Sequence, residues 1–187
     1  MDLRKEILKE HSKKQAVKIA KWIGNNPVRF KQLMQLFLFD EYRIVQRSAW
    51  IVSICVENHP ALIKPWLQKM LLKTQEKNVH GAVKRNVMRI LQFVEIPKSL
   101  QGIAAEIAFQ FLANKNEAIA IRVFSMTVIF NLTQKEPDLK NELRLLIEEN
   151  IPYEKAAFKS RGKKILKALS KQQYGLFSFA GEIPARG

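Results

Sequence analysis

The side chains best suited to bind a ligand are a tryptophan and the arginines near it. Trp50 shares one side of a predicted helix with Arg43 and Arg47. An indole ring flanked by guanidinium groups can stack on a nucleobase or anchor a peptide, because an aromatic ring offers a large contact area with defined geometry. The alternative is that Trp50, beside Ile51 and Ile54, fills a gap between packed helices.

A second group of cations occupies the equivalent part of a later helix, at Lys84, Arg85 and Arg89. If the two helices stack, these rows align with the Trp50 row into one basic strip. Further basic surfaces are predicted near the two ends of the chain, with the residues Lys14, Lys18, Lys21, Lys159, Lys163 and Lys167. A strip that joined both ends could follow a phosphate backbone and would bind in a salt-dependent way. For each end alone, a solvated helix face is the alternative.

No arrangement of side chains indicates catalysis or a bound cofactor. His11, His59 and His80 are far apart, and none stands beside a cysteine or carboxylate cluster at metal-binding spacing. The sequence shows no glycine-rich phosphate loop, no Gly-x-Ser-x-Gly motif and no distinctive pair of carboxylates. We therefore expect a protein that is not an enzyme and has no catalytic residues, metal, cofactor or small-molecule substrate.

The basic residues recur with a period typical of stacked helix pairs. Lys14, Arg47, Arg85, Arg122 and Arg161 lie 33, 38, 37 and 39 residues apart. Each opens an apolar helical stretch, and four of them are followed at a nearly fixed distance by a proline, namely Pro27, Pro60, Pro97 and Pro137. Proline suits the first position of a helix, where its missing N–H would lack an intrahelical partner anyway. The period predicts an all-α solenoid of about five antiparallel helix pairs.

The same marks place the individual helices. We expect helix pairs at 2–10 with 12–24, 27–39 with 42–58, 60–76 with 80–95, 97–115 with 117–133, and 137–150 with 154–170. The helix at 117–133 is apolar nearly all round and should be the most enclosed. The helix at 154–170 carries a lysine stripe and resembles a terminal cap. A single domain is expected over residues 1–170, followed by a partly ordered tail at 171–187.

Composition limits the classes of partner. The formal charge of +15 and the pI of about 10.0 favour attraction to nucleic acid, an anionic membrane surface or an acidic protein, with solubility as the alternative. Cys55 is the only cysteine, which excludes an intramolecular disulfide, and its apolar neighbours predict an inert buried thiol. No uncharged apolar run approaches the roughly 20 residues that span a bilayer. We expect no membrane insertion and a cytoplasmic location.

A basic residue opens the second helix of each pair, as in Val45-Gln46-Arg47-Ser48-Ala49 and Val83-Lys84-Arg85-Asn86-Val87. In this pattern and period the chain resembles HEAT and HEAT-like repeats, which are armadillo-type α-solenoids, and in particular short chains of bacterial type. The resemblance covers most of the sequence. It implies a right-handed superhelix whose concave face is lined by the second helices, beginning near Tyr42, Gly81, Glu117 and Glu154.

The resemblance also implies roles for single residues. In HEAT repeats the arginine that matches Arg47 often supports the repeat by pairing with an acidic or amide residue in the preceding turn. Asp40 or Glu41 would serve Arg47, and Asn116 would serve Arg122. Contact of these arginines with a ligand is the alternative.

Three functions follow from these observations. The first is a non-catalytic scaffold that binds a macromolecule, protein or nucleic acid, through its concave face. The second is a basic nucleic-acid-binding module. The third is a HEAT-like DNA glycosylase of the alkylpurine type, a class that works with tryptophans and an acidic residue. Its pattern is poorly met, because the positions one turn after Trp22, Trp50 and Trp66 hold Asn26, Ile54 and Met70.

Overall fold

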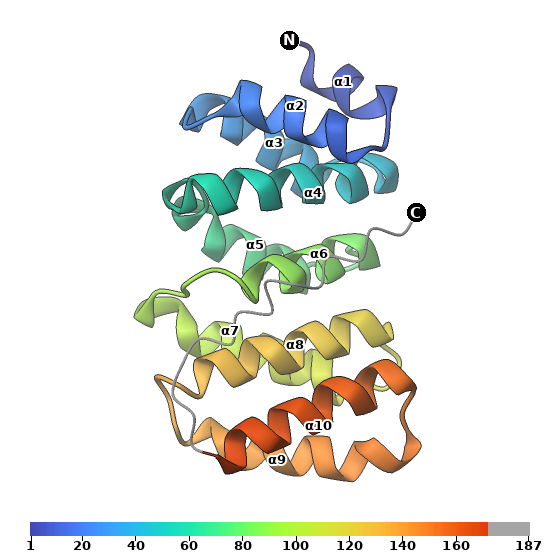
Figure 1. The fold of residues 1–187 in the computed structure, drawn as a ribbon, viewed down its shortest axis with the longest axis vertical. Coiled ribbons are helices and arrows are strands. Elements are labelled where there is room, and N and C mark those ends of the chain that lie inside the picture. The colour runs from blue at the N-terminus through green and yellow to red at the C-terminus, as the bar shows by residue number, and fades with distance from the viewer. Residues whose placement is uncertain (172–187) are drawn as a thin grey trace. The chain divides into compact units, whose positions relative to one another are not determined.

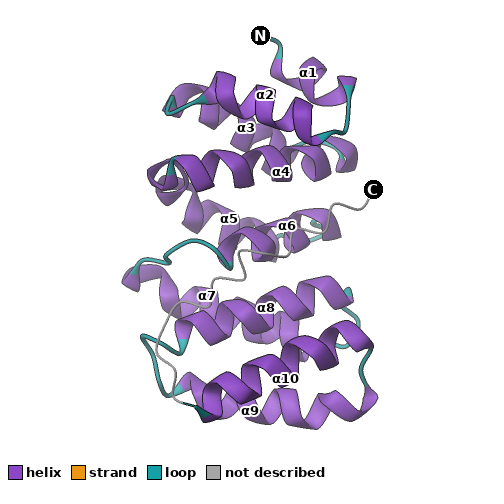
Figure 2. Ribbon diagram, in the orientation of Figure 1, coloured by secondary structure: helices purple, strands orange, loops and turns teal. Residues whose placement is uncertain are grey.

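The computed structural model describes residues 1–171, and all regular structure in this part of the chain is helical (Figure 2). It contains ten α-helices and two 3-10 helices. Their bounds are α1 Leu3–Lys9, α2 Lys13–Ile23, α3 Pro27–Phe39, α4 Tyr42–Asn58, η1 Pro60–Trp66, α5 Leu67–Gln75, α6 Gly81–Leu91, α7 Lys98–Ala113, α8 Ile119–Leu132, α9 Leu139–Asn150, η2 Ile151–Tyr153 and α10 Ala156–Ser170. The predicted all-α fold class is confirmed for the described residues.

The chain divides into two compact units, each of which packs mainly on itself. Unit 1 comprises Met1–Ile107, and unit 2 begins at Ala108, so the division falls within α7. The single domain expected over 1–170 stays a prediction. The tail expected at 171–187 lies outside the described residues from position 172 onward.

In unit 1 the helices form two layers (Figure 1). Helix α4 packs against α2 on one side and α6 on the other, so these three second helices lie next to one another. Behind them, α3 packs on α4, and α5 packs on α6. The side chains between the layers form a core of large apolar groups that includes Phe30, Phe37 and Met70.

Side-chain caps fix where several of these helices begin. Asp2, Ser12 and Asn26 each accept hydrogen bonds from backbone N–H groups of the first turn of α1, α2 and α3, respectively. Such caps satisfy donors that have no intrahelical partner. Gly24 ends α2 with a φ of 52°, in the left-handed region that glycine tolerates best. The predicted bounds of α3 and α4 are confirmed to the residue, and α2 lies one residue inside the predicted range 12–24 at each end.

In unit 2, α8 is the most enclosed helix, as predicted. Most of its residues are buried, because α9 and α10 both pack against it. Phe130 of α8 and Phe158 of α10 are both fully buried. Helix α9 also packs on α10, so the three helices share one core.

Two predicted boundaries were wrong. The segment expected as one helix at 60–76 is a 3-10 helix, η1, followed by α5. Pro65 explains the change, because proline lacks the N–H of an α-helical bond and its ring clashes with the carbonyl four residues before it. Helix α6 ends at Leu91 rather than near residue 95.

Candidate functional site

Charge is distributed unequally between the two kinds of helix. The second helices α2, α4, α6, α8 and α10 contain a single carboxylate, Glu57. Their cations are Lys13, Lys14, Lys18, Lys21, Arg43, Arg47, Lys84, Arg85, Arg89, Arg122, Lys159, Arg161, Lys163, Lys164 and Lys167. In unit 2 the positive charge is therefore concentrated on the second helices α8 and α10, whereas in unit 1 the first helices α1, α3 and α5 are also basic, with Glu6 as their single carboxylate.

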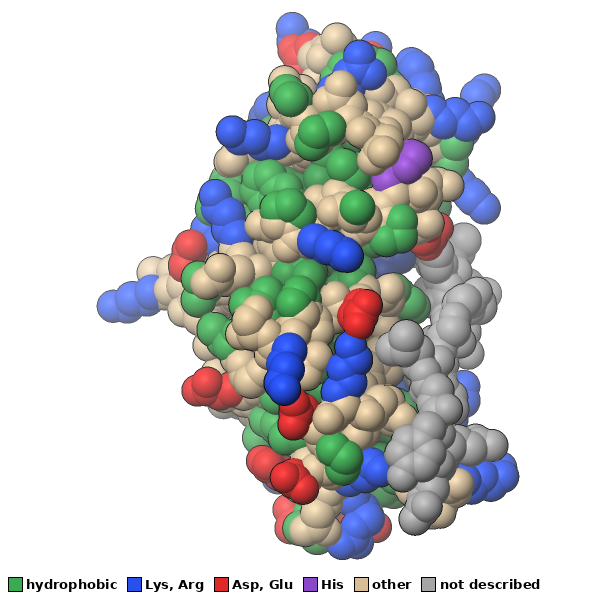
Figure 3. All heavy atoms as spheres, turned by 90° about the vertical axis from the view of Figure 1, so that its left-hand side faces the viewer, with side chains coloured by type: hydrophobic (Ala, Val, Ile, Leu, Met, Phe, Trp, Pro, Cys, Tyr) green, Lys and Arg blue, Asp and Glu red, His purple; other side chains and the backbone are tan. Residues whose placement is uncertain are grey.

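The first helices carry both signs of charge. Their carboxylates are Glu6, Glu106, Glu142, Glu148 and Glu149, set among ten lysines and arginines. Acidic and basic groups also lie among apolar ones on the side of the molecule that Figure 3 shows. Opposite charges so mixed weaken the field that any distant ion experiences.

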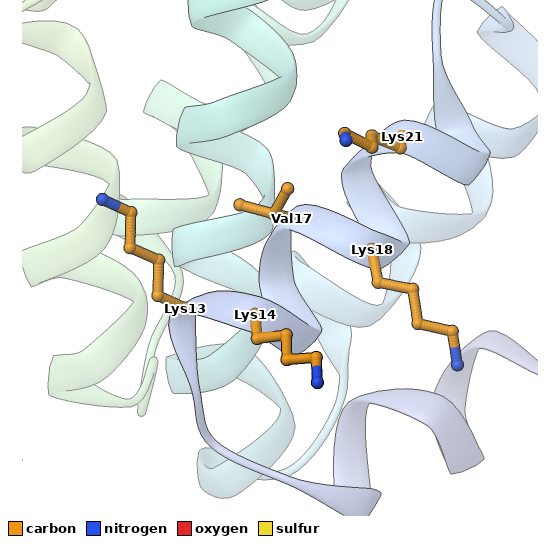
Figure 4. Close-up of a pocket in the computed structure, with 5 residues that line it drawn as sticks. All are labelled: Lys13, Lys14, Val17, Lys18 and Lys21. Atoms are coloured by element: carbon orange, nitrogen blue, oxygen red, sulfur yellow. The ribbon is translucent and has the colours of Figure 1, made fainter.

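Helix α2 supplies an exposed cluster of lysines in unit 1. Lys13, Lys14, Lys18 and Lys21 line an open surface pocket around Val17, and all of them come from this one helix (Figure 4). Their positions follow from the opposite face of the helix, which is buried. Lys18 also reaches Glu6 of α1, with 3.2 Å between Nζ and Oε2.

The same carboxylate is held ionised by its neighbours. Hydrogen bonds from Lys9, Gln15 and Lys18 lower the pKa of Glu6 to about 2. Lys18 is thus partly committed to α1, whereas sequence reasoning grouped it with Lys14 and Lys21.

Helix α4 holds two of the predicted binding residues in structural contacts. Nη1 of Arg47 donates to the carbonyl oxygens of Ile7 at 3.1 Å and Leu8 at 2.8 Å, in the last turn of α1. Trp50 is half-buried and meets the ring of His11 edge to face, with centroids 6.1 Å apart. Trp50 therefore fills a gap between α4 and the turn before α2, which was the alternative interpretation of this residue. Arg43 is exposed.

Helix α6, which packs against α4, carries three cations that are partly accessible to solvent. Lys84, Arg85 and Arg89 are all half-buried. Burial lowers the pKa of the Arg89 guanidinium, and the neighbouring charge of Arg85 lowers it further, while Glu57 of α4 acts in the opposite direction. Arg89 is thus a partly desolvated cation with a like charge one turn away, an arrangement that costs free energy in the absence of an anion.

We call the solvent-facing cations of α2, α4 and α6 the basic face of unit 1. It consists of Lys13, Lys14, Lys18, Lys21, Arg43, Lys84, Arg85 and Arg89. Because α4 packs on both α2 and α6, these residues belong to one layer. The sequence missed Lys13, although its place in the same lysine-rich helix was visible.

In unit 2 the cations divide into buried and exposed ones. Arg122 is buried; its Nε donates to the carbonyl oxygen of Leu112 at 2.9 Å, and its Nη1 pairs with Glu154. Its guanidinium carbon also lies 5.0 Å from the centre of the Phe158 ring. Arg161 of α10 donates to Oγ1 of Thr127 at 2.8 Å.

The remaining basic residues predicted in this unit lie on α10. Lys163 and Lys167 are exposed, and Lys159 is half-buried. Lys164, which sequence reasoning did not single out, is exposed on the same helix.

The arginines that open the second helices do support the repeat, but not through the predicted partners. Arg47 and Arg122 bind carbonyl oxygens in the last turns of α1 and α7, where unpaired C=O groups and the helix dipole favour a cation. Asp40 and Glu41 pair instead with Arg4 of α1. Asn116 was wrong for Arg122, whose carboxylate partner is Glu154, after α9.

Large exposed apolar side chains lie mostly outside the second helices. Within residues 1–171, they are Met1, Val28, Phe39, Tyr42, Leu72, Phe93, Leu145 and Tyr153, and of these Tyr42 alone belongs to a second helix. The ring of Tyr42 contacts that of His80, the residue that precedes α6, with centroids 4.8 Å apart. Lys69 and Lys73 lie over the ring of Phe39. The sequence did not indicate these two contacts, because they join different helices.

The described residues contain no cluster of three or more His, Cys, Asp or Glu side chains that could hold a metal ion. Within residues 1–171, no helix has the length and apolar character to cross a bilayer. The contacts found for the tryptophans are with Arg29, His11 and Lys69 rather than with a carboxylate. The glycosylase alternative therefore gains no support from them.

A family model described as HEAT repeat domain matches residues 3–169. No curated protein and no solved structure matches the chain. HEAT repeats generally serve as non-catalytic scaffolds, commonly for interaction with other macromolecules. The period of the basic residues, the helix pairs and this match agree, and the chain belongs to the HEAT repeat domain family.

Proposed function

We propose that the protein is a non-catalytic scaffold that binds an acidic macromolecule through the basic face of unit 1. A cytoplasmic location is part of this proposal and rests on the single, buried cysteine. The charge of the packed second helices of unit 1 carries the proposal. Helices α2, α4 and α6 lie in one layer and carry nine cations and a single carboxylate, Glu57.

The environment of α6 supports the same conclusion. Arg85 and Arg89 are one turn apart and half-buried, and Glu57 is the carboxylate that acts on Arg89. Two like charges at this spacing cost a few tenths of a kcal/mol on an isolated helix. Loss of hydration adds to that cost. An anionic partner would offset both costs by pairing with these cations, which favours association over a purely solvated face.

The proposal is tested with a variant and a control that remove the same amount of charge. The variant Lys84→Gln, Arg85→Gln, Arg89→Gln neutralises the α6 part of the basic face. The control Lys31→Gln, Lys64→Gln, Lys77→Gln neutralises three exposed lysines on α3, on η1 and after α5. Binding of each full-length protein to two polyanions, poly-L-glutamate and a short DNA duplex, is measured by fluorescence anisotropy at low salt.

We expect the wild-type protein and the control to bind at least one polyanion with similar affinity. The α6 variant should bind about tenfold more weakly, because salt-dependent contacts are lost from the face itself. Circular dichroism checks that both variants keep their helices. Equal weakening of variant and control would mean that total charge matters and position does not, which contradicts the proposal.

A further inference from the structure

We infer that the basic face of unit 1 binds the phosphate backbone of a double-stranded nucleic acid, an inference that rests on the function proposed above. Three properties of the face distinguish this occupant from an acidic protein and from a single strand. They are the scarcity of exposed apolar side chains, the contacts made by the tryptophans of α2 and α4, and the type of the cations.

Protein interfaces need apolar anchors that the basic face lacks. The centre of a protein interface is enriched in aromatic side chains and arginine and depleted in lysine. No large exposed apolar side chain of residues 1–171 lies on α2 or α6, and Tyr42 stands at the very start of α4, against His80. Interfaces with nucleic acid are more polar and far more positive. The composition of the basic face therefore matches an interface with nucleic acid rather than one with protein.

A single strand would need open aromatic platforms for its bases. Trp22 and Trp50 are the tryptophans of α2 and α4, and both are half-buried. The guanidinium of Arg29 lies 4.5 Å from the centre of the Trp22 ring, and His11 meets Trp50. Both rings are thus half-buried and already in contact with another side chain, which reduces the aromatic surface open to a base. A duplex presents its backbone and keeps its bases stacked internally, so it requires no such platform.

The cations of the face suit contact with phosphates rather than base edges. Five of its eight members are lysines, which act as mobile point charges and lack the planar fork with which arginine reads guanine. Residues one turn apart on a helix are about 5–6 Å apart, and packed helices lie about 8–10 Å apart. The result is a broad area of positive charge. Such contacts position a duplex without reading its sequence.

The test compares four probes with the full-length protein over a series of salt concentrations, by fluorescence anisotropy. The probes are a DNA duplex, an RNA duplex of the same sequence, the corresponding single DNA strand, and poly-L-glutamate. We expect at least one duplex to bind more tightly than the single strand and poly-L-glutamate. A scrambled duplex should bind equally well. The logarithm of the association constant should fall linearly with the logarithm of salt concentration, by about 0.9 for each phosphate contacted on DNA. The two duplexes show whether the helix is DNA or RNA.

A second set of variants locates the contact. The variant Lys13→Gln, Lys14→Gln, Lys21→Gln alters three exposed side chains of α2, so it should keep the fold. It should weaken duplex binding about tenfold at low salt and make the salt dependence shallower by about 2–3. The control Lys31→Gln, Lys64→Gln, Lys77→Gln should leave that salt dependence nearly unchanged.

Each of the other outcomes would overturn a particular part of this inference or of the proposed function. Binding of poly-L-glutamate without binding of either duplex would overturn this inference and leave the proposed function standing. Tighter binding of the single strand would overturn the assignment to a duplex. Equal loss in the α2 variant and the control would overturn the assignment to the basic face. If none of the four probes binds at low salt, the proposed function and this inference both fail.

Discussion

Two of the arginines that recur with the repeat period, Arg47 and Arg122, act within the fold. Arg47 and Arg122 donate to carbonyl oxygens at the ends of α1 and α7, which lack intrahelical partners. Arg122 additionally forms a buried ion pair with Glu154. At these two positions the recurring arginine therefore serves the architecture, whereas Arg85 belongs to the basic face.

Replacing Arg122 should show this structural role. Arg122→Ala leaves Glu154, whose side chain is 13% exposed, and the Leu112 carbonyl without their donor. We expect the free energy of unfolding to fall by about 2–4 kcal/mol, measured by urea denaturation. The matched control is Arg144→Ala, because Arg144 pairs with Glu148 on the surface of α9, where both side chains are about half-exposed. Its cost should stay within about 0.5 kcal/mol. Similar costs for both variants would contradict the role assigned to Arg122.

Cys55 provides a second residue-level prediction. Burial raises the pKa of its thiol to about 12, so little thiolate exists near pH 8. Alkylation by iodoacetamide should be slower in the folded protein than in urea by about three orders of magnitude, because the thiolate is the reacting form. Mass spectrometry over time measures both rates. Rapid labelling under native conditions would show that the α4 core opens readily.

At the level of elements, local signals predicted most helices, and the wrong prediction at 60–76 has a local cause. The caps Ser12 and Asn26, and Pro27 at the first helical position, all lie within a few residues of the helix starts that they determine. The error at 60–76 came from Pro65, which was visible in the sequence but was not used. By contrast, nothing local predicts which helix an arginine will reach, since Arg47 binds residues about 40 positions away.

Two helical glycines test how tightly the elements pack. A Cβ at Gly162 of α10 would lie 2.8 Å from Cγ2 of Ile147 on α9, whereas a Cβ at Gly102 of α7 would have nothing within 4 Å. Gly162→Ala should destabilise the protein by about 1–3 kcal/mol through overpacking. Gly102→Ala should be neutral or stabilising by up to about 1 kcal/mol, because alanine loses less backbone entropy. Thermal unfolding of both variants gives the comparison. A stabilising Gly162→Ala would show that α9 and α10 have room to move apart.

At the level of the whole molecule, the position of charge matters more than its sum. The net charge of +15 is a property of the composition, but the gathering of cations from α2, α4 and α6 into one layer of unit 1 depends on how these helices pack. A field concentrated on one layer attracts a polyanion more strongly than the same charge spread among carboxylates. Glu57 is the carboxylate that weakens this field beside Arg89.

Two single neutralisations separate position from sum. Glu57→Gln and Glu142→Gln raise the net charge equally, but Glu57 lies on α4 beside the basic face and Glu142 is an exposed residue of α9. We expect Glu57→Gln to strengthen binding to the preferred polyanion about two- to fivefold at low salt. Glu142→Gln should leave the affinity nearly unchanged. A difference that persists at high salt would mean that charge is not its cause, because salt screens interactions between exposed charges.

The helices, their pairing and the surplus of positive charge could be predicted from the sequence alone. These features follow from periodic apolar residues, caps and prolines, which act over a few residues, and from composition, which does not depend on the order of the residues. The packing of distant segments, by contrast, makes Arg47 and Arg122 bind helix ends, brings His11 against Trp50, and leaves Arg89 half-buried beside Glu57. Those outcomes depend on which distant segments meet and on how much water they exclude, and neither is encoded in the spacing of residues along one helix.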